Sequence, residues 1–334
     1  MSANLGGKIL VTGGAGFIGS HLCEYLVAFG ARVVVLDNFR NGKRKNLTFV
    51  GAEALEIIEG DIVDAATCER AMAGVETVYH LACLGVRHSL HSPVENHQVN
   101  ALGTLNVLEA ARAAKVKRFV YVSTSEIYGR AKEFPITENC TPWPLTVYGS
   151  SKLAGEHYAR SYFECWQLPV VCVRPFNNYG PRSHFEGDSG EVIPRFLLRA
   201  LAGQPPVIFG DGGHTRDFLY VKDCAETLVK IAGCDALVGE VVNLGYGEEL
   251  RIDVLARTVM EAAGRPDLQT VFEAPRPADV PKLWVDTAKL KQAIDFRPRV
   301  SLREGIGHTL DYFRKLYREN PAALGQIKLK NWEA

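Results

Sequence analysis

The stretch VTGGAGFIGSHL, residues 11–22, decides the fold of this chain. It follows a short apolar run and opens a helical pattern that ends at Gly30. Gly13, Gly16 and Gly19 allow a tight turn and a close approach of phosphate to the backbone, and a helix N-terminus offers free N–H groups. A glycine-rich turn without a ligand is the alternative, but the position between strand and helix favours a dinucleotide pyrophosphate site.

Strand-like runs alternate with helical patterns through the first half of the chain. We predict strands at 8–12 (KILVT), 31–37 (ARVVVLD), 55–62 (LEIIEGDI), 77–82 (TVYHLA), 118–123 (RFVYVS) and 169–175 (PVVCVRP), with helices at 17–30, 99–114 and 148–166. Continuous apolar strands separated by helices are typical of a parallel sheet covered on both faces. The predicted fold class is therefore α/β, with a Rossmann-type doubly wound sheet.

This rhythm breaks after residue 175. Segments such as AGQPPVIFGDGG and VVNLGYG place prolines, glycines and short strands among helices. We therefore predict a dinucleotide-binding domain at 1–175 and a smaller mixed α/β domain at 176–330 that holds the substrate. No clean boundary is visible, so segments of the second region could return to the sheet.

Composition excludes several classes of function. The 334 residues include 38 basic and 38 acidic side chains, so no global charge attracts nucleic acid or an anionic membrane. We expect no membrane span, because no apolar run is long enough, and no signal peptide in MSANLGGKIL. The eight cysteines contain no CxxC pair, which predicts reduced thiols and no metal site. A cytoplasmic enzyme fits this composition.

Asp37 closes the second predicted strand. An acid at this position accepts hydrogen bonds from an adenosine ribose and repels a 2′-phosphate, so NAD is favoured over NADP. The basic residues within 40–45 keep this preference from being absolute. Asp61 either reaches the adenine edge or shapes a turn, and both interpretations stay open.

Tyr148 and Lys152 lie four residues apart in the helical segment YGSSK, which puts both on one helix face. A nearby ammonium lowers the pKa of a tyrosine from about 10, so Tyr148 could act as a base near neutral pH. Thr124, at the end of the fifth predicted strand, offers its hydroxyl to the same substrate oxygen. A surface tyrosine and lysine are the alternative, which the upstream dinucleotide loop argues against.

Together, TGGAGFIGSHL, HLA (80–82), STSEIYG (123–129), YGSSK and RPFNNYGP resemble the extended short-chain dehydrogenases. More narrowly, they resemble the NAD-dependent epimerase/dehydratase family that acts on nucleotide sugars. The resemblance runs from about residue 8 to about residue 316. It implies NAD as cofactor, a nucleoside diphosphate sugar as substrate, and a homodimer packed through helices near 99–114 and 148–166.

The resemblance also implies roles for individual residues. The expected catalytic residues are Tyr148, Lys152, Thr124 and Glu126. The expected cofactor-binding residues are Gly13, Gly16, Phe17, Ile18, Gly19, Asp37, Asn38, Asp61, Ile62, Leu81, Ala82, Asn100, Tyr148 and Lys152. The expected substrate-binding residues are Arg87, Asn177, Arg216, Arg276 and Asp279. Arg216, and Arg276 with Asp279, would hold the diphosphate and the nucleoside ribose, since a diphosphate needs fixed cations; surface salt bridges are the alternative.

The chemistry implied for the family begins with one shared step. Tyr148 takes the proton of the sugar C4 hydroxyl and the C4 hydride passes to NAD, which leaves a 4-keto sugar and a recycled cofactor. A 4-epimerase, a 4,6-dehydratase and a UDP-glucuronate decarboxylase differ only in later steps. A non-catalytic NAD-binding sensor is disfavoured by the presence of Tyr148 and Lys152. A secondary alcohol dehydrogenase that releases NADH is disfavoured by the residues assigned to the diphosphate.

Glu126 decides between these outcomes. Simple 4-epimerases usually carry a small residue there, whereas TSE resembles UDP-glucuronate decarboxylases and GDP-mannose 4,6-dehydratases. Ser125 stands where dehydratases of the dTDP-glucose type carry an acid, and RPADVPKLWVD (276–286) favours an epimerase. The balance predicts a lyase, with decarboxylation ahead of dehydration and a UDP-glucose or UDP-glucuronate 4-epimerase as the alternative. The alternative role of Glu126 is a structural carboxylate that caps a turn.

The segment LGVRHSLHS (84–92) adds a prediction about substrate charge. Arg87, His88 and His91 bring more positive potential than a neutral hexose needs, and GVRHS resembles a segment of nucleotide-uronate epimerases. We therefore expect Arg87 to pair with the carboxylate of a uronate; an arginine that faces solvent or a cofactor phosphate is the alternative. The nucleoside base and the sugar stereochemistry cannot be derived from the chain.

Overall fold

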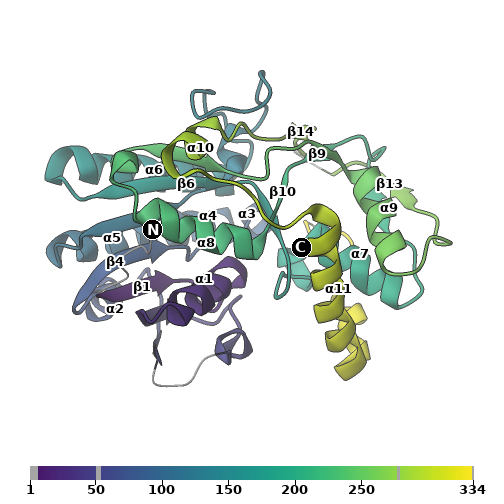
Figure 1. Ribbon diagram of the computed structural model, residues 1–334, viewed down its shortest axis with the longest axis horizontal. Helices are drawn as coiled ribbons and strands as arrows, with labels where there is room; N and C mark the ends of the chain where they lie inside the picture. Colours follow the sequence, from purple (N-terminus) through teal and green to yellow (C-terminus); the bar gives the residue numbers. More distant parts are fainter. Residues whose placement is uncertain (1–6, 50–53, 277–278, 333–334) are drawn as a thin grey trace.

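A computed structural model describes residues 7–49, 54–276 and 279–332. Its centre is a seven-stranded sheet in the order β11-β6-β5-β4-β1-β2-β3, in which all neighbours are parallel (Figure 1). The strands are β1 (Lys8–Thr12), β2 (Arg32–Asp37), β3 (Leu55–Glu59), β4 (Val75–His80), β5 (Arg118–Val122), β6 (Val170–Pro175) and β11 (Val241–Leu244). The predicted Rossmann-type α/β fold class is confirmed.

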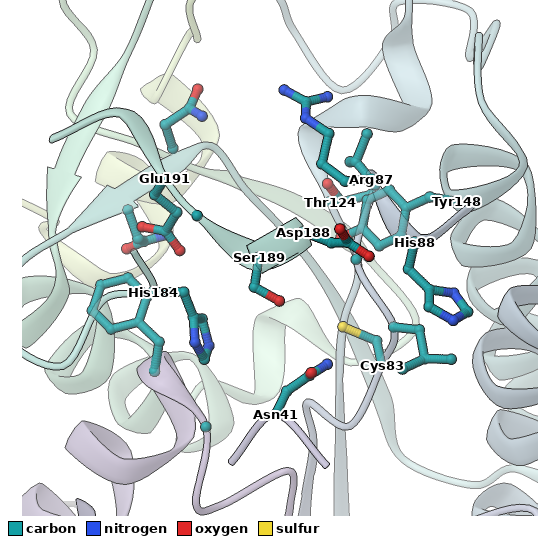
Figure 2. A pocket seen from close by; sticks show the side chains of 18 of the residues that line it. Asn41, Cys83, Arg87, His88, Thr124, Tyr148, His184, Asp188, Ser189 and Glu191 are labelled. Atoms are coloured by element: carbon teal, nitrogen blue, oxygen red, sulfur yellow. The ribbon is translucent and has the colours of Figure 1, made fainter. Parts of the chain in front are cut away.

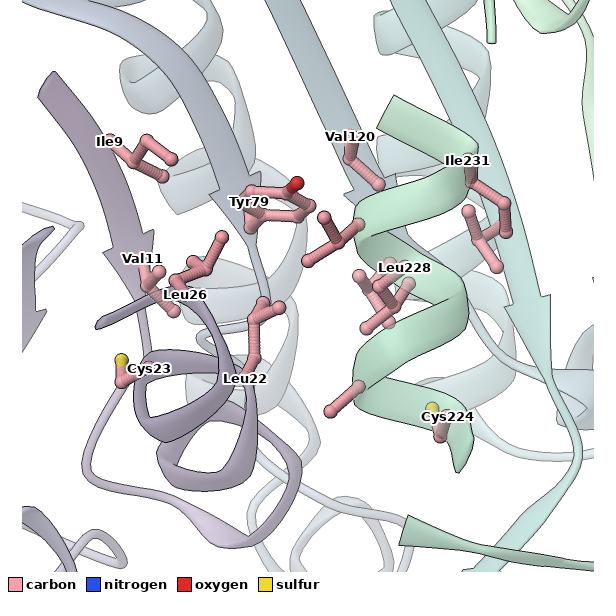
Figure 3. Packing of buried hydrophobic residues seen from close by; sticks show 14 of the residues in the cluster. Ile9, Val11, Leu22, Cys23, Leu26, Tyr79, Val120, Cys224, Leu228 and Ile231 are labelled. Carbon is pink, nitrogen blue, oxygen red and sulfur yellow. The ribbon is translucent and has the colours of Figure 1, made fainter. Parts of the chain in front are cut away.

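Alternate strand residues supply two apolar layers. One face packs against α1 (Phe17–Ala28), α8 (Val221–Ala232) and α10 (Ala288–Ile294). The other face packs against α2 (Ala65–Ala71), α5 (Gly103–Ala113) and α6 (Val147–Trp166). Figure 3 shows α1 and α8 side by side over the strands, with Leu22 and Leu26 of α1 facing the same core as Leu228 and Ile231 of α8.

Element boundaries differ from the predictions at a few places. The third strand ends at Glu59 because Asp61 turns the chain, its Oδ1 accepting from the Val63 N–H at 2.9 Å. The helix predicted at 99–114 begins as a π-helical turn, Gln98–Leu102, and becomes α-helical only in α5. Near this turn, the side-chain amides of Asn96 and Asn100 both donate to the Leu84 carbonyl oxygen, in the loop that follows β4.

The chain beyond residue 175 contributes both to the main sheet with its covering helices, the first layer, and to a smaller second layer with its own core. β11 pairs with β6 as an edge strand of the main sheet, and α8 lies against α1. A second core gathers α7 (Val192–Leu201), α9 (Ile252–Ala262) and α11 (Leu302–Glu319). Three small sheets complete this region. Two are strand pairs: β7 (Asn177–Tyr179) with β10 (Phe218–Tyr220), and β8 (Val207–Phe209) with β13 (Val271–Glu273). The third has three strands: β9 (Thr215–Arg216) between β12 (Leu250–Arg251) and β14 (Lys282–Leu283). No helix within the described ranges is long and apolar enough to cross a membrane.

A buried ion pair ties the sheet to α6. The Arg174 Nε donates to Glu156 Oε2 at 3.1 Å, and both side chains are at most 5% exposed. The Arg174 Nη1 also donates to the Tyr128 hydroxyl at 2.7 Å, which in turn donates to Asn243 Oδ1 at 2.7 Å. This network joins β6, α6, β11 and the turn that follows β5. Tyr128 ends that turn, and Thr124 and Glu126 begin it.

We therefore expect Glu156→Ala to destabilise the protein by about 3–5 kcal/mol, because it leaves the Arg174 guanidinium buried without its counter-charge. Urea denaturation followed by circular dichroism measures the change. Glu76→Ala is the control, because Glu76 forms an exposed pair with Lys117 at 2.8 Å and should cost less than about 1 kcal/mol. Equal effects of the two substitutions would contradict the role of the buried network.

Candidate active site

A cavity of about 850 Å³ lies at the carboxyl edge of the sheet, between the two layers. Ligands of open α/β sheets bind at this edge, where the loops after parallel strands converge. In Figure 2, Arg87, Thr124 and Tyr148 lie on one side of the cavity and His184 and Glu191 on the other, with Asp188 and Ser189 between them. The loop between β1 and α1 also lines the cavity, at the end where a dinucleotide is expected.

The glycine loop is packed as tightly as its sequence predicts. Gly13 has a φ of +70°, and a Cβ on Gly19 would lie 2.2 Å from the Gly13 carbonyl oxygen. The N-terminal N–H groups of α1 have no partner within the helix. Because Gly13, Gly16, Phe17, Ile18 and Gly19 all line the cavity, this cradle fits a pyrophosphate.

Asp37 and Asp61 both reach the same end of the cavity. The Asp37 carboxylate accepts from the Ala15 N–H at 2.9 Å and from the Phe39 N–H at 2.8 Å, and its burial raises its pKa. Asp61 accepts from the Asn38 side chain at 2.8 Å while it also shapes its own turn. Both interpretations of Asp61 are thus compatible with its position.

Three of the four basic residues within 40–45 form ion pairs with acids. Arg40 pairs with Glu95, Lys43 with Glu186 and Arg44 with Glu59. Three cations that could have bound a 2′-phosphate therefore already have carboxylate partners. This arrangement agrees with the preference for NAD derived from Asp37.

Ile62, Leu81 and Ala82 also line the cavity, but two expected cofactor residues do not. Asn100 is 1% exposed, and its amide bonds the Leu84 N–H at 2.8 Å and the Leu84 carbonyl at 2.9 Å. Lys152 is also 1% exposed, and its Nζ donates to the Val122 carbonyl at 2.7 Å. In this structure both residues brace the cavity wall from behind.

Tyr148 lines the cavity beside Thr124, but its pKa does not behave as predicted. Burial raises the pKa of the phenol, Cys83 and Glu126 raise it further, and hydrogen bonding by Thr124 offsets only part of the rise. The expected lowering by Lys152 is wrong for this structure, because the Lys152 ammonium is directed to a backbone carbonyl. Proton removal from Tyr148 therefore needs additional positive charge near the phenol.

Arginines dominate the opposite end of the cavity. Arg216 Nη2 donates to Asp279 Oδ1 at 2.7 Å, and Arg276 Nε lies 3.6 Å from Asp279 Oδ2. The two residues between Arg276 and Asp279 lie outside the described residues. Burial, with repulsion from Arg87, lowers the pKa of Arg276 to about 10. The Asn177 Oδ1 is buried without a hydrogen-bond partner among the described residues, and it lines the same cavity.

Glu126 faces these arginines. Burial raises the pKa of its carboxyl group, while Arg216 and Arg87 lower it. The turn that follows β5 is capped by the Thr124 hydroxyl, which accepts from the Glu126 N–H at 3.2 Å. The Glu126 carboxylate forms no hydrogen bond with any described residue, so the capping role belongs to Thr124 and the carboxylate is left for a ligand.

Arg87 differs from its neighbours in the same segment. His88 interacts with Glu95 at 3.0 Å and His91 with Asp188 at 2.5 Å. Arg87 forms no ion pair or hydrogen bond within the described part of the chain, and its side chain is partly buried, which lowers its pKa. Its guanidinium lines the cavity near Thr124 and Tyr148 (Figure 2).

Several cavity residues escaped the sequence analysis. Cys83, Arg195, Glu191 and Phe209 all line the cavity. Cys83 follows β4 at the carboxyl edge of the sheet, which is a usable signal. Arg195 lies on α7, Glu191 directly precedes this helix and Phe209 lies on β8, and no motif marks these three residues. Among the described residues, no group of three or more His, Cys, Asp or Glu side chains could hold a metal ion.

Comparison with known proteins agrees with this site. The model of the NAD dependent epimerase/dehydratase family matches residues 9–245. A UDP-glucose 4-epimerase of Mycolicibacterium smegmatis is 36% identical over 311 residues, covering 92% of this chain and 98% of the relative. UDP-glucuronic acid decarboxylase 1 of Arabidopsis thaliana is 37% identical over 317 residues, covering 92% of this chain and 70% of the relative.

A solved structure extends the likeness to three dimensions. A mutant of UDP-glucuronic acid 4-epimerase from Bacillus cereus, in complex with a fluorinated UDP-glucuronic acid and NAD, superposes with a TM-score of 0.87 at 32% identity. It covers 93% of this chain and is itself covered in full. The predicted cofactor, NAD, is confirmed, and the glycine cradle and Asp37 fit it. The chain belongs to the NAD dependent epimerase/dehydratase family.

Proposed function

We propose that this protein converts a nucleoside diphosphate uronate, and that it acts as a decarboxylating lyase. The observation that carries the proposal is the placement of Arg87 and Glu126 in one cavity beside Tyr148 and Thr124. The Glu126 carboxylate and the Arg87 guanidinium form no hydrogen bond or ion pair with the described residues, and both residues line the same cavity. A decarboxylase of this kind must bind the C5 carboxylate of the sugar and must protonate C5. Arg87 is suited to the first task and Glu126 to the second.

Charge supports a substrate with three negative groups. Arg216 and Arg276 flank Asp279 and are the cations for a diphosphate. Arg87 is a further cation that lines the same cavity. Glu126 and Asp279 already provide negative charge near Arg87, and a uronate would add a carboxylate that a neutral hexose lacks.

The residues divide the chemistry between them. NAD would be held by the glycine loop and Asp37, and it would supply a hydride acceptor and a positively charged nicotinamide ring. Tyr148 removes the C4 hydroxyl proton, and Thr124 orients that hydroxyl. The resulting 4-keto sugar carries its carboxylate β to the ketone, so the C5–carboxylate bond breaks, CO2 leaves, and the electron pair moves into the C4–C5 enolate. Glu126 then donates a proton to C5, and return of the hydride to C4 and of the proton from Tyr148 to the C4 oxygen would complete the cycle without net oxidation.

A 4-epimerase is the second candidate. Full-length likeness to UDP-glucose 4-epimerases and to a UDP-glucuronic acid 4-epimerase favours it. An epimerase needs Tyr148 and space for the keto sugar to rotate, but it has no step for Glu126. A 4,6-dehydratase remains a third, and it would also use Glu126.

We also propose a homodimer. The apolar side chains of Leu102 and Trp166 are 44% and 53% exposed, at the two helical regions expected to pack in such an assembly. Burial of such side chains against a second copy would remove apolar surface from water.

Tyr148→Phe should lower turnover by at least ~100-fold while NAD and substrate still bind, because only the proton acceptor is lost. Steady-state rates with a nucleotide-sugar panel measure the loss, and acid extraction measures bound NAD. Tyr158→Phe, on the same helix and outside the cavity, should keep the wild-type rate. A Tyr148→Phe enzyme with near-normal activity would exclude the proposed base.

Glu126→Gln should stall the reaction after C4 oxidation, so that reduced cofactor accumulates and is detected by its absorbance. The raised pKa of Glu126 keeps its proton on at higher pH than an ordinary glutamate. The protonation step should therefore slow as pH rises through that pKa, and the glutamine variant should lack this limb of the pH profile. Glu133→Gln, an exposed glutamate of the following loop, should behave as wild type.

Mass spectrometry of the wild-type product separates the candidates. Loss of CO2 supports decarboxylation and loss of water supports dehydration. An unchanged mass, with Glu126→Gln at the wild-type rate, would replace the lyase with the 4-epimerase.

Arg87→Ala should lower kcat/KM for a uronate by at least about tenfold, since a hydrogen bond to a charged group contributes about 1.5–3 kcal/mol. Neutral nucleotide sugars should lose far less. Parallel measurements with paired uronate and neutral substrates test this difference. Equal losses on both substrates would remove the carboxylate pairing from the proposal.

A further inference from the structure

The C-terminal segment after α11 returns to the cavity. It passes through a short 3₁₀ helix, Pro321–Gln326, and is described as far as Trp332. Leu329 lines the cavity, and its carbonyl oxygen accepts from Arg195 Nη2 at 2.7 Å. Arg195 is itself a cavity residue on α7. This contact places the segment 328–332, called here the tail, against the wall of the site.

Asn331 connects the tail to a second wall. Its side chain is 1% exposed, and its Nδ2 donates to the carbonyl oxygens of Asp188 at 3.3 Å and Gly190 at 3.1 Å. The Lys328 Nζ lies 3.8 Å from the Asp188 carboxylate. The segment that carries Asp188 and Gly190 lies between the two sides of the cavity in Figure 2. The tail therefore holds this segment in place from outside the cavity.

Trp332 reaches the third wall, where the arginines lie. Its ring meets Phe209 of β8 edge-on, with 4.7 Å between centroids. The Arg276 guanidinium lies 5.4 Å from the Phe209 centroid and 5.9 Å from the Trp332 centroid. The Arg276 Nε is buried without a hydrogen-bond partner among the described residues. The rings of Phe209 and Trp332 thus position the Arg276 guanidinium, whose Nε–H remains available to donate a hydrogen bond.

We infer that the tail is part of the nucleoside diphosphate subsite, with Trp332 and Asn331 as positioning residues for Arg276 and for the segment around Asp188. This inference rests on the proposed function, because it takes the ligand of Arg276 to be a diphosphate. The tail also lies beyond residues 9–245, the part of the chain that the family model matches.

The test measures binding of UDP, dTDP and GDP to the NAD-loaded protein by calorimetry. Trp332→Ala should weaken the tightest of these complexes by about tenfold, since Arg276 loses a desolvated aromatic partner. Trp332→Phe should restore most of the affinity. In turnover, Trp332→Ala should raise KM with kcat nearly unchanged, the pattern of a group that binds ground state and transition state alike.

Trp143→Ala is the control. Trp143 is 71% exposed and does not line the cavity. It should leave nucleotide affinity unchanged. Bound NAD and the melting temperature, measured for each variant, separate a loss of positioning from a loss of fold.

Hydrogen exchange on the wild-type protein gives a test without substitution. Adding the tightest-binding nucleoside diphosphate should slow exchange of backbone amides in residues 327–332. Wild-type affinity of Trp332→Ala, or of a protein that lacks residues 327–334, would overturn the inference, as would unchanged exchange. If the wild-type protein binds none of the three nucleotides, the proposed function fails instead.

Discussion

The close contact between Gly19 and the Gly13 carbonyl is the constraint on which the site depends. A side chain at Gly19 would lie 2.2 Å from that oxygen, so α1 can begin directly under the end of β1 only because both positions lack one. This contact aims the first turn of α1 at the carboxyl edge of the sheet. It also lets Asp37 reach back to the Ala15 N–H, which joins the pyrophosphate cradle to the ribose position.

Positive charge is concentrated in the rest of the cavity. The protein as a whole is neutral, yet Arg87, Arg195, Arg216 and Arg276 line the same cavity. Burial and mutual repulsion lower the pKa of Arg195 and of Arg276 to about 10. Such a cluster is stable only beside anions. Glu126 and Asp279 supply part of that charge, and a phosphorylated substrate supplies more.

The two layers hold each other in register because the chain crosses between them repeatedly. α8 packs on α1 although some 200 residues separate them in the sequence, and β11 closes the sheet beside β6. The tail then crosses back to the cavity wall through Arg195 and Asn331. Consequently the residues of the second layer that face the cofactor side are fixed by contacts with the first layer, and not by their own short strands.

The α/β sheet, the cofactor and the position of Tyr148 and Thr124 could all be predicted from the amino-acid sequence. These features depend on local rules: periodicity for strands and helices, glycine spacing for the phosphate loop, and strand ends that meet at one edge of a parallel sheet. Only the tertiary structure decided that Lys152 and Asn100 brace the wall, because their partners Val122 and Leu84 come from other elements. It also decided that Arg195, Glu191 and the tail reach the site. Those residues carry no motif, and their proximity arises from long-range packing that no local pattern encodes.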